Sequence, residues 1–544
     1  MSPASAGPFE GLPDAPASKP WAFLLKQHRQ PVVLLASLLI LVVCLSVDLD
    51  DKDSSAYAQR PKAARGAAVM LMWWFTEVVP LTITSLLPLV LYPLLGIAKL
   101  SVLASKFFKN TSFLFVAGFF IGLAVERWGL HSRAVCLVVS TAGSRLELVI
   151  GGFMVSVWLL SMWISNTATI LCMLPMAQAF LKSLPPGTER FQSAFLLAVG
   201  YSATVGGIAM PVGTPTNGIF MQQFSELWPG EGDFSFAKLV FCAFPLSALL
   251  LMVVWLGFCT VFVWRLAKED RIVVDPELFR SMRRNLGKVT YEQIVVASTL
   301  GLLIVLWFTQ SKIDTFPGWK KHVAENLDSG SIGLLLTLPL FFLPCGSRLP
   351  AAVRRAIGED RCQSIAGTGP AVFEPRRILD WKAVRDGFHW EILFVFGGGA
   401  VIAYGTVESG FAGWTAEQLS QADLGEFFFL LLVTFVICFV TEVVSNMATL
   451  SIFGSIIAAT AQLKGYDPVK FLLAVCFASS FAFMLPMAGG PNMVVYSTGA
   501  IPVSTMAKFG FLLNLVAIVL GGSYIALVMP SLLGSYDDLP APSS

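Results

Sequence analysis

The sequence predicts an all-α polytopic membrane protein built from two related halves. Of its 544 residues, 55% are hydrophobic and only 13% are charged, about half the charged fraction of a soluble domain. Apolar runs of the roughly 20 residues that a membrane helix needs recur along the chain. The net charge of +2 gives no indication of a nucleic-acid partner.

The N-terminal segment 1–30 is rich in Pro, Ala and Ser and is predicted to be a disordered cytoplasmic tail. The apolar run at 31–48 lacks a small-residue cleavage pattern, which favours a first transmembrane helix over a signal peptide. Ten further spans are predicted, for about eleven in all: 66–80, 81–98, 112–126, 191–222, 236–265, 289–309, 330–345, 389–407, 468–488 and 505–533.

Two more apolar stretches, at 148–183 and 424–462, carry polar clusters halfway along their length. A continuous spanning helix would place these clusters in lipid, where each unsatisfied polar group is costly. Each stretch is therefore predicted to be a re-entrant helical hairpin, which enters the membrane and returns to the same side.

The distribution of positive charge predicts the orientation. The loops at 266–288 and 346–388 are rich in Lys and Arg, whereas the loop at 223–235 carries only acidic charges. Because cytoplasmic loops hold the excess of basic residues, eleven spans and a cytoplasmic N-terminus put both basic loops inside. The acidic loop and the C-terminal tail at 534–544 then lie outside. The plasma membrane is the expected location, with an organelle membrane as the alternative.

Three short motifs recur in the same order in the two halves. The first motif, Phe115-Val116-Ala117-Gly118, is matched by Phe394-Val395-Phe396-Gly397. The second, Ser165-Asn166-Thr167-Ala168-Thr169, is matched by Ser445-Asn446-Met447-Ala448-Thr449. The third, Thr214-Pro215-Thr216-Asn217, is matched by Gly489-Gly490-Pro491-Asn492. An odd number of predicted spans separates the paired motifs. The segments 66–265 and 289–533 are therefore predicted to form an inverted repeat, which is typical of secondary transporters.

The paired clusters indicate a binding site. One Ser-Asn-Thr cluster could simply join helices, but two clusters in matched hairpins, each followed by a Pro-Asn break, favour a shared site. Carbonyls freed at the breaks, together with Ser and Asn oxygens, suit a hard cation such as Na⁺, and opened helix N-termini suit an anion. The motifs contain no Arg or Lys, so a multiply charged anion would need co-bound cations, which predicts obligatory coupling.

The segments Trp163–Thr169 and Thr441–Asn446 resemble the two signatures of the divalent anion–sodium symporter family, which includes sodium-dependent dicarboxylate, citrate and sulfate carriers. Thr76–Leu81, Glu126–His131 and Gly397–Gly399 are similar to other segments of that family, and the resemblance runs from about residue 67 to the C-terminus. It implies a homodimer whose protomers have a scaffold domain and a transport domain that moves as an elevator.

The resemblance also implies which residues bind. The first sodium site would use Ser161, Ser165, Asn166 and Gly213. The second would use Thr441, Ser445, Asn446 and Ala488. The substrate would meet Ser165, Asn166, Thr167, Thr214, Ser445 and Asn446. Two departures bear on this set: Met447 stands where the first cluster has Thr, and Gly489-Gly490 stands where the family often has Thr-Pro. A hydroxyl expected near the substrate is missing, so the substrate preference and the second sodium site are expected to differ.

Four other polar residues are candidates of lower rank. Glu442 adjoins the second cluster and is a candidate to tune its cation site. Glu77 and Glu126 are expected at interfaces or span ends. Asn110 begins an N-glycosylation sequon in a loop predicted to lie outside, and whether it is used stays open.

The leading hypothesis is sodium-coupled import of small di- or tricarboxylates such as succinate, malate or citrate. A sodium–sulfate carrier and a sodium-independent dicarboxylate exchanger are alternatives with the same architecture. A membrane-embedded enzyme has little support because the breaks carry no cluster of His, Asp or Cys, and a channel would need a continuous pore. No catalytic residue and no organic cofactor are expected, and Na⁺ is expected as the co-transported ion.

Overall fold

A computed structural model describes residues 79–533, together with Trp73, Tyr536 and Leu539. The range has gaps at 142–144, 186–187, 264–280, 282–283, 285, 311–317, 321–325, 351–352, 354–376 and 421–423. In these residues the regular structure is helical, apart from one antiparallel bridge between Pro344 and Arg377. Seven of the described helices are long and apolar enough to cross a membrane, which confirms the predicted all-α membrane fold. The predicted tail at 1–30, the span at 31–48 and nearly all of the span at 66–80 lie outside the described residues.

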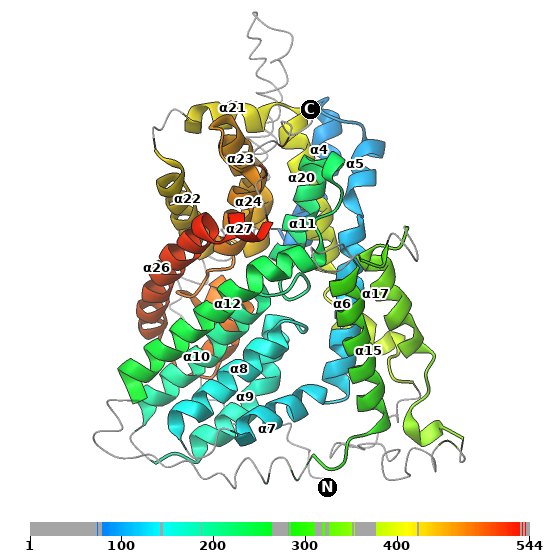
Figure 1. The fold of residues 1–544 in the computed structure, drawn as a ribbon, viewed down its shortest axis with the longest axis vertical. Helices are drawn as coiled ribbons and strands as arrows, with labels where there is room; N and C mark the ends of the chain where they lie inside the picture. Colours follow the sequence, from blue (N-terminus) through cyan, green and yellow to red (C-terminus); the bar gives the residue numbers. More distant parts are fainter. Residues whose placement is uncertain are drawn as a thin grey trace, which may run out of the picture.

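Two sets of helices follow one another in the same order. The first set is α6 (Asn110–Arg127), α7 (Leu130–Thr141), α8 (Leu146–Ser161), α9 (Asn166–Lys182), α10 (Glu189–Ile208), α11 (Pro215–Leu227) and α12 (Phe236–Phe258). The second set is α20 (Glu391–Glu408), α21 (Phe411–Ser420), α22 (Glu426–Thr441), α23 (Asn446–Leu463), α24 (Pro468–Ala478), α25 (Gly490–Ser497) and α26 (Val503–Leu527). Figure 1 draws α7, α8 and α9 at the lower end of the molecule and α21, α22 and α23 at the upper end. The two sets therefore enter from opposite ends, as the predicted inverted repeat requires.

The remaining named α-helices accompany these sets. They are α3 (Leu81–Thr84), α4 (Pro88–Leu94), α5 (Leu100–Phe107), α15 (Tyr291–Thr309), α17 (Ser329–Thr337), α19 (Trp381–Gly387) and α27 (Met529–Leu533). The span predicted at 81–98 is thus two short helices, since Pro88 begins a new one. The span predicted at 330–345 is α17 continued by a 3-10 segment, Leu338–Phe341, in which Pro339 provides no amide proton.

Both predicted hairpins are helix–break–helix units. The helices α8 and α9 span 146–182, and α22 and α23 span 426–463, each end within two residues of the predicted 148–183 and 424–462. Extended backbone at Ser165 and Ser445 ends the turn and begins the second helix. At Ser165 the side chain also accepts a hydrogen bond from the backbone N–H of Ala168, which satisfies one of the free amides of the first helical turn.

Two further predictions of single continuous spans are wrong. The stretch 191–222 is divided between α10, which ends at Ile208, and α11, which begins at Pro215. In the stretch 468–488 only the first part is α-helical, because α24 ends at Ala478. One 3-10 turn follows at Pro486–Ala488, and α25 begins at Gly490, beyond the predicted end of the span. Periodicity could not locate these breaks because both flanking segments are apolar. The proline after each break removes a backbone donor and favours a new helix start.

Two smaller points also differ from the sequence prediction. The short helices α7 and α21 were not predicted, since each joins a span to a hairpin and is too short for a membrane helix. The acidic loop predicted at 223–235 loses Glu226 to α11, where its buried carboxylate forms ion pairs with Lys106, at 2.8 Å, and with Lys109. The loop therefore carries less negative charge than the sequence prediction assigned to it.

The two halves pack into each other at their breaks. The second hairpin helix of each half, α9 or α23, lies against the helix after the break of the other half, α25 or α11. Phe115 of α6 and Phe396 of α20 meet edge to face, with ring centroids 4.7 Å apart. A Cβ atom at Gly218 of α11 would collide with both rings, so the glycine allows three helices to meet at one point.

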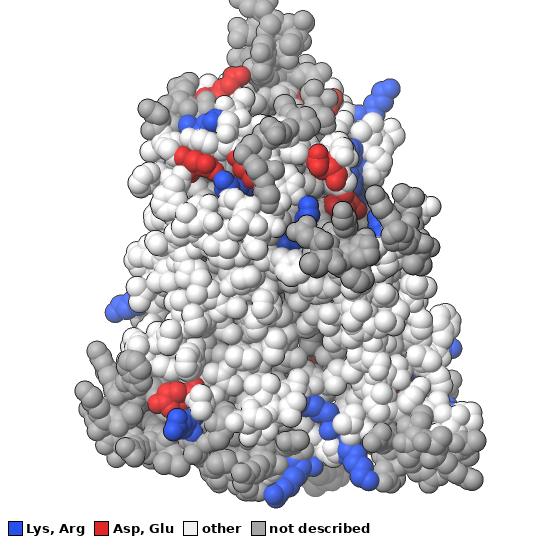
Figure 2. Space-filling model, viewed as in Figure 1, with Lys and Arg blue, Asp and Glu red and all other residues white. Residues whose placement is uncertain are grey.

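The charge distribution fits a membrane protein. Figure 2 shows Lys, Arg, Asp and Glu gathered toward the two ends of one face, with a broad and nearly uncharged band between them. The exposed hydrophobic side chains include Leu302 and Val305 of α15 and Leu512 and Val519 of α26. Because lipid is the natural neighbour of such a band, the membrane-spanning part of the chain covers the middle of the molecule.

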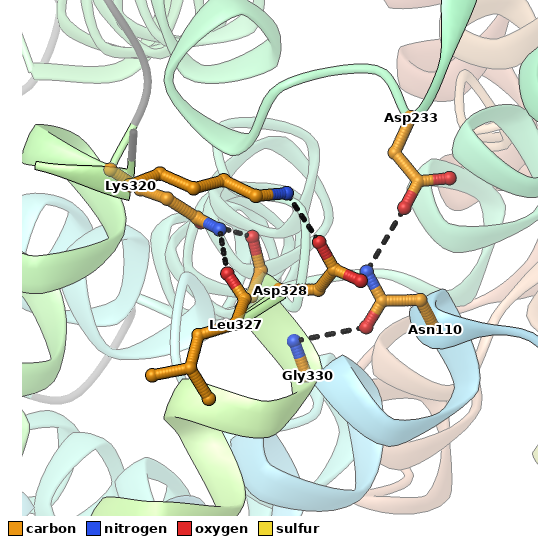
Figure 3. Close-up of polar contacts among 8 residues, drawn as sticks. Asn110, Asp233, Lys320, Leu327, Asp328 and Gly330 are labelled. Carbon is orange, nitrogen blue, oxygen red and sulfur yellow. Dashed lines mark hydrogen bonds and ion pairs between the residues drawn. The ribbon is translucent and has the colours of Figure 1, made fainter. Parts of the chain in front are cut away.

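Asn110 lies at the start of α6 and not in a loop, which corrects the sequence prediction. Its side-chain amide donates to Asp233 at 3.0 Å, and its side-chain oxygen accepts from the backbone N–H of Gly330 at 3.3 Å (Figure 3). Beside it, Lys320 donates to Asp328 at 2.5 Å. The Asn110 side chain thus joins the first turn of α6 to the segment after α11 and to the start of α17.

We expect Asn110 to carry no glycan, because its amide nitrogen is hydrogen-bonded and its backbone is already helical. After expression in a glycosylating eukaryotic cell, treatment with peptide N-glycosidase should leave the electrophoretic mobility unchanged. The Asn110→Gln variant should migrate with the unaltered protein. A mobility shift that disappears in Asn110→Gln would contradict this prediction.

Candidate functional site

A cavity of about 460 Å³ lies where the two hairpins meet the two broken helices. All six residues predicted to bind substrate line it: Ser165, Asn166, Thr167, Thr214, Ser445 and Asn446. Gly213 and Ala488 of the predicted sodium sets line it too, whereas Ser161 and Thr441 are fully buried behind its wall. The inverted repeat thus brings residues about 280 positions apart, such as Asn166 and Asn446, to one cavity.

Four helix N-termini contribute to the wall of this cavity. The helices α9 and α23 begin at Asn166 and Asn446, directly after the hairpin turns. The helices α11 and α25 begin at Pro215 and Gly490, directly after the breaks. The first amides of a helix have no partner within the helix and carry a partial positive charge. Four such ends at one cavity form a favourable environment for anionic oxygens that needs no charged side chain.

On the first-half side, three oxygens converge. The Ser161 hydroxyl oxygen lies 2.6 Å from the Asn166 side-chain oxygen and 2.7 Å from the Ala203 carbonyl oxygen. A hydroxyl has one proton and can donate to only one of these acceptors at a time. The other pair of oxygens then lies close together with no proton between them, and a bound cation would stabilise this contact.

The second half repeats this arrangement. The Thr441 hydroxyl oxygen lies 2.7 Å from the Asn446 side-chain oxygen and 2.7 Å from the Ser479 carbonyl oxygen. Ser161 and Thr441 occupy the same place in the two hairpins, five residues before the asparagine. Neutral oxygen ligands at short range are the coordination that hard cations prefer, so the donor set of each cluster fits a sodium ion.

Each break is held open by an asparagine after the proline. The Asn217 amide donates to the carbonyls of Ile208 at 3.0 Å and Met210 at 2.7 Å. Asn492 donates in the same way to Ala482 at 3.0 Å and Leu485 at 3.1 Å. These amides partly compensate carbonyls that lost their helical donors at the break, in a buried place where an unpaired carbonyl is costly.

Glycines set how closely the first cluster can pack. A Cβ atom at Gly207 would overlap the side-chain amide of Asn166, and one at Gly213 would lie 2.5 Å from the Gly207 carbonyl oxygen. Gly213 therefore lies against the Gly207 carbonyl in the last turn of α10, and Asn166 lies against Gly207. At these two positions a larger residue would push the oxygens apart.

Glu442, the candidate to tune the second cation site, directly follows Thr441 of the second oxygen cluster and contacts the second break. Its carboxylate accepts hydrogen bonds from the backbone N–H groups of Phe483, Met484 and Leu485, at 2.8 to 3.1 Å, and from the side-chain amide of Asn514 at 2.7 Å. Four donors therefore surround this buried carboxylate, which fixes the backbone of the second break. The equivalent position in the first half is Met162, so this support exists in one half only.

The rim of the cavity is acidic. Glu126, His389 and Glu391 line it, and none of the described residues that line it is Lys or Arg. The neighbouring Arg127 donates to Asp380 at 2.6 Å, and this contact lowers the pKa of the Asp380 carboxyl below its usual range. The Arg127 guanidinium is thus engaged by a carboxylate, and none of the described lining residues offers a basic Lys or Arg side chain to an anion in the cavity.

Sequence reasoning missed several parts of the site. The carbonyls of Ala203 and Ser479 and the close packing of Gly207 have no signature, because a backbone carbonyl can come from any residue. The supporting role of Asn217 and Asn492 could have been inferred, since each follows a proline that frees carbonyls. The Glu442 contacts required the position of residues 41 to 72 places away.

Comparison with solved structures identifies the class of fold. The chain is similar to the Neisseria gonorrhoeae MtrF protein, described as one of a class of antimetabolite efflux pumps, with a TM-score of 0.53 and 14% identity over 82% of this chain and 85% of that one. It is also similar to the Alcanivorax borkumensis YdaH transporter, with a TM-score of 0.52 and 16% identity over 78% and 87% of the two chains. The inverted repeat and the paired breaks thus belong to a fold found in membrane transporters.

Sequence comparison identifies the family. Residues 32–530 match the family described as the sodium:sulfate symporter transmembrane region. The chain is 30% identical to the sodium-dependent dicarboxylate transporter SdcS of Staphylococcus saprophyticus, over 86% of each chain. It is also 30% identical to solute carrier family 13 member 2 of Mus musculus, over 88% of this chain and 90% of that one. The protein therefore belongs to the sodium:sulfate symporter family, which confirms the resemblance to divalent anion–sodium symporters.

We expect Glu442→Gln to destabilise the protein by about 1–3 kcal/mol, because a buried backbone N–H would then face an amide nitrogen instead of an oxygen. Glu442→Ala should cost more, since it leaves all four donors without their acceptor. The measurement is the midpoint of thermal unfolding of the detergent-purified protein, followed by intrinsic fluorescence. Glu126→Gln, at the cavity rim, is the matched control and should unfold within about 0.5 kcal/mol of the unaltered protein. Equal midpoints for all variants would exclude the proposed support of the second break.

Proposed function

We propose that this protein couples the movement of sodium ions to the import of small di- or tricarboxylates such as succinate, malate or citrate. The observation that carries the proposal is the cavity where four helix N-termini meet two oxygen clusters of identical design. The N-termini suit carboxylate oxygens, and the oxygen clusters suit sodium. The names of the relatives, a sodium-dependent dicarboxylate transporter among them, support the same assignment.

Coupling follows from the charge of the cavity. A dicarboxylate would bring two negative charges to a wall that has no Lys or Arg among its described residues and an acidic rim. Partial charges at helix ends offset only part of this cost. Sodium ions at the Ser161–Asn166 and Thr441–Asn446 clusters would supply the missing charge, so we propose that sodium binds before the anion and raises its affinity.

We further propose an elevator mechanism in a homodimer. Under it the two hairpins and the two broken helices, which share the cavity, form the transport domain. The other helices, including α6 and α20, form the scaffold. The cavity rim includes Gly387 and His389, which border the basic loop predicted to be cytoplasmic. In the proposed topology the described conformation is therefore open to the cytoplasm, with the N-terminus inside and the C-terminus outside at the plasma membrane.

Two related activities stay as alternatives. A sulfate carrier would use the same helix ends, but a cavity of about 460 Å³ lies within the range that binds small organic ligands. A sodium-independent exchanger would leave the two oxygen clusters without a role. Both observations favour sodium-coupled carboxylate transport over these alternatives.

Uptake by proteoliposomes tests the proposal. Labelled succinate, citrate and sulfate are offered with an inward sodium gradient, or with potassium in place of sodium. The proposal expects carboxylate uptake above background in sodium only. Sulfate uptake alone would favour the sulfate carrier, and uptake in both cations would favour exchange. Uptake of none of the three anions would contradict all three versions.

Asn166→Ala and Asn446→Ala should each reduce sodium-driven uptake to background. Each change removes one oxygen of a cation cluster and one amide at the cavity wall. The initial rate of succinate uptake is the measurement, and Asn110→Gln, at a residue that does not line the cavity, is a matched control that should retain near-normal uptake. Near-normal uptake in either cavity variant would count against the site in that half.

Ser161→Ala and Thr441→Val should raise the sodium concentration needed for half-maximal uptake by about tenfold, the loss expected for one polar ligand. Because both residues lie behind the cavity wall, the half-saturating succinate concentration at saturating sodium should change much less. Ser156→Ala is the matched control, since the Ser156 hydroxyl only donates to the Gly152 carbonyl within α8. Unchanged sodium dependence in both variants would show that these oxygens are not sodium ligands.

A further inference from the structure

Glu226 is a buried carboxylate in the last turn of α11, and it is not among the residues that line the cavity. Only 1% of its side chain is exposed, and its two oxygens form ion pairs with Lys106, at 2.8 Å, and with Lys109. Among the described residues, neither oxygen has a hydrogen-bonding partner besides these ammonium groups. The two lysines are therefore what compensates the cost of burying this charge.

The two lysines belong to the part of the molecule around α20. Lys106 lies in α5, and Lys109 directly precedes α6. The ammonium nitrogen of Lys106 lies 4.9 Å from the centre of the Tyr404 ring of α20. A Cβ atom at Gly397 of α20 would collide with the Phe107 ring, so α5 packs closely on α20. In the proposed elevator, α5, α6 and α20 all belong to the scaffold.

Glu226 belongs to the other part of the molecule. Three residues before it, the side-chain amide of Gln223 donates to the carbonyls of Leu450 and Ser451 in α23, at 3.3 and 3.1 Å. The helix α11 is thereby joined to the second hairpin, which is part of the proposed transport domain. The ion pairs of Glu226 thus connect the proposed transport domain to the proposed scaffold.

A second ion pair has a different placement and provides a comparison. The ammonium group of Lys470 in α24 lies 2.6 Å from the carboxylate of Glu426 in α22. Both helices belong to the proposed transport domain. This pair can therefore stay intact when the domain moves, whereas the pairs of Glu226 with Lys106 and Lys109 cannot.

From this placement we propose that Glu226, Lys106 and Lys109 form a latch, which holds the transport domain in the described position and opens in each transport cycle. This inference rests on the proposed function. In the proposed topology the end of α11 faces the outer side of the membrane, so outward movement carries Glu226 toward the external solution. Water then replaces the lysines around its carboxylate. A buried ion pair suits such a switch, because the attraction between its charges is largely offset by their desolvation.

A reversible cross-link tests the latch. In the variant Lys106→Cys with Glu226→Cys, a short bifunctional methanethiosulfonate joins the two thiols through disulfide bonds that a reductant cleaves. Cross-linking should reduce sodium-driven succinate uptake to background, and reduction should restore it. The matched control is Lys470→Cys with Glu426→Cys, in which the cross-link joins two helices of one domain and should leave uptake near normal.

Full uptake by the cross-linked variant at 106 and 226 would overturn the inference, because it would show that α5 and α11 need not separate. Absence of sodium-driven succinate uptake in the unaltered protein would instead contradict the proposed function. The two failures are therefore distinguishable.

The position of the transport domain provides a second test, which does not depend on uptake. Gly489 lines the cavity, and a Cβ atom there would meet only the Pro491 ring, at 3.8 Å. Gly489→Cys therefore has room for its side chain, and its labelling by a membrane-impermeant maleimide reports which side the cavity faces. Inside-out and right-side-out vesicles give the labelling rates from the two sides, and vesicles without Gly489→Cys give the background.

In Glu226→Gln, labelling from the cytoplasmic side should fall and labelling from the outer side should rise, so that their ratio changes about tenfold. Glu226→Lys with Lys106→Glu, which exchanges the charges, should bring the ratio back toward that of the unaltered protein. Glu426→Gln is the matched control and should keep the original ratio. An unchanged ratio in Glu226→Gln would overturn the latch.

Discussion

Backbone groups that lose their helical partners inside an apolar layer are the constraint on which this structure depends. Each half of the chain interrupts a helix twice, once at the hairpin turn and once at the downstream break. In lipid such groups could not be left unpaired, so the two halves place all four interruptions together around one cavity. Asn217, Asn492 and Glu442 compensate part of the exposed backbone. The amides and carbonyls that remain are the groups available to a ligand.

This origin of the site explains its chemistry. Helix N-termini provide partial positive charge and helix C-termini provide carbonyl oxygens, so an interrupted helix presents groups for an anion and for a cation within a few residues. A lysine or arginine on the wall would bind an anion tightly in the absence of sodium and would weaken any dependence on it. A neutral wall makes the affinity for the anion conditional on cations that bind nearby. Among the described residues that line the cavity none is Lys or Arg, and Glu126 and Glu391 add negative charge, so under the proposed function the anion would need co-bound cations.

Much of the fold and of the cavity wall could be predicted from the sequence, since the Ser-Asn clusters are exceptional in apolar surroundings and occur twice. The six residues predicted from the motifs and the family resemblance line one cavity, although their binding role stays a prediction. The breaks at 209–214 and 479–489 were not predicted, because hydrophobicity does not distinguish one continuous apolar helix from two helices joined by a break. Carbonyl ligands such as that of Ala203 are invisible in a sequence because every residue has a carbonyl. Contacts such as Glu442 with Asn514 depend on tertiary packing.

The duplicated architecture also separates what is common to the halves from what can diverge. Positions that build the interruptions are alike in both halves: the hydroxyl of Ser161 or Thr441, the asparagine that follows it, and the asparagine after each break. Positions that only face the cavity are free to change, since no backbone group depends on them. Thr167 against Met447 and Thr214 against Gly489 are such positions, since all four residues line the cavity and differ between the halves. The repeated framework thereby keeps two similar oxygen clusters while the residues that only face the cavity differ between the halves.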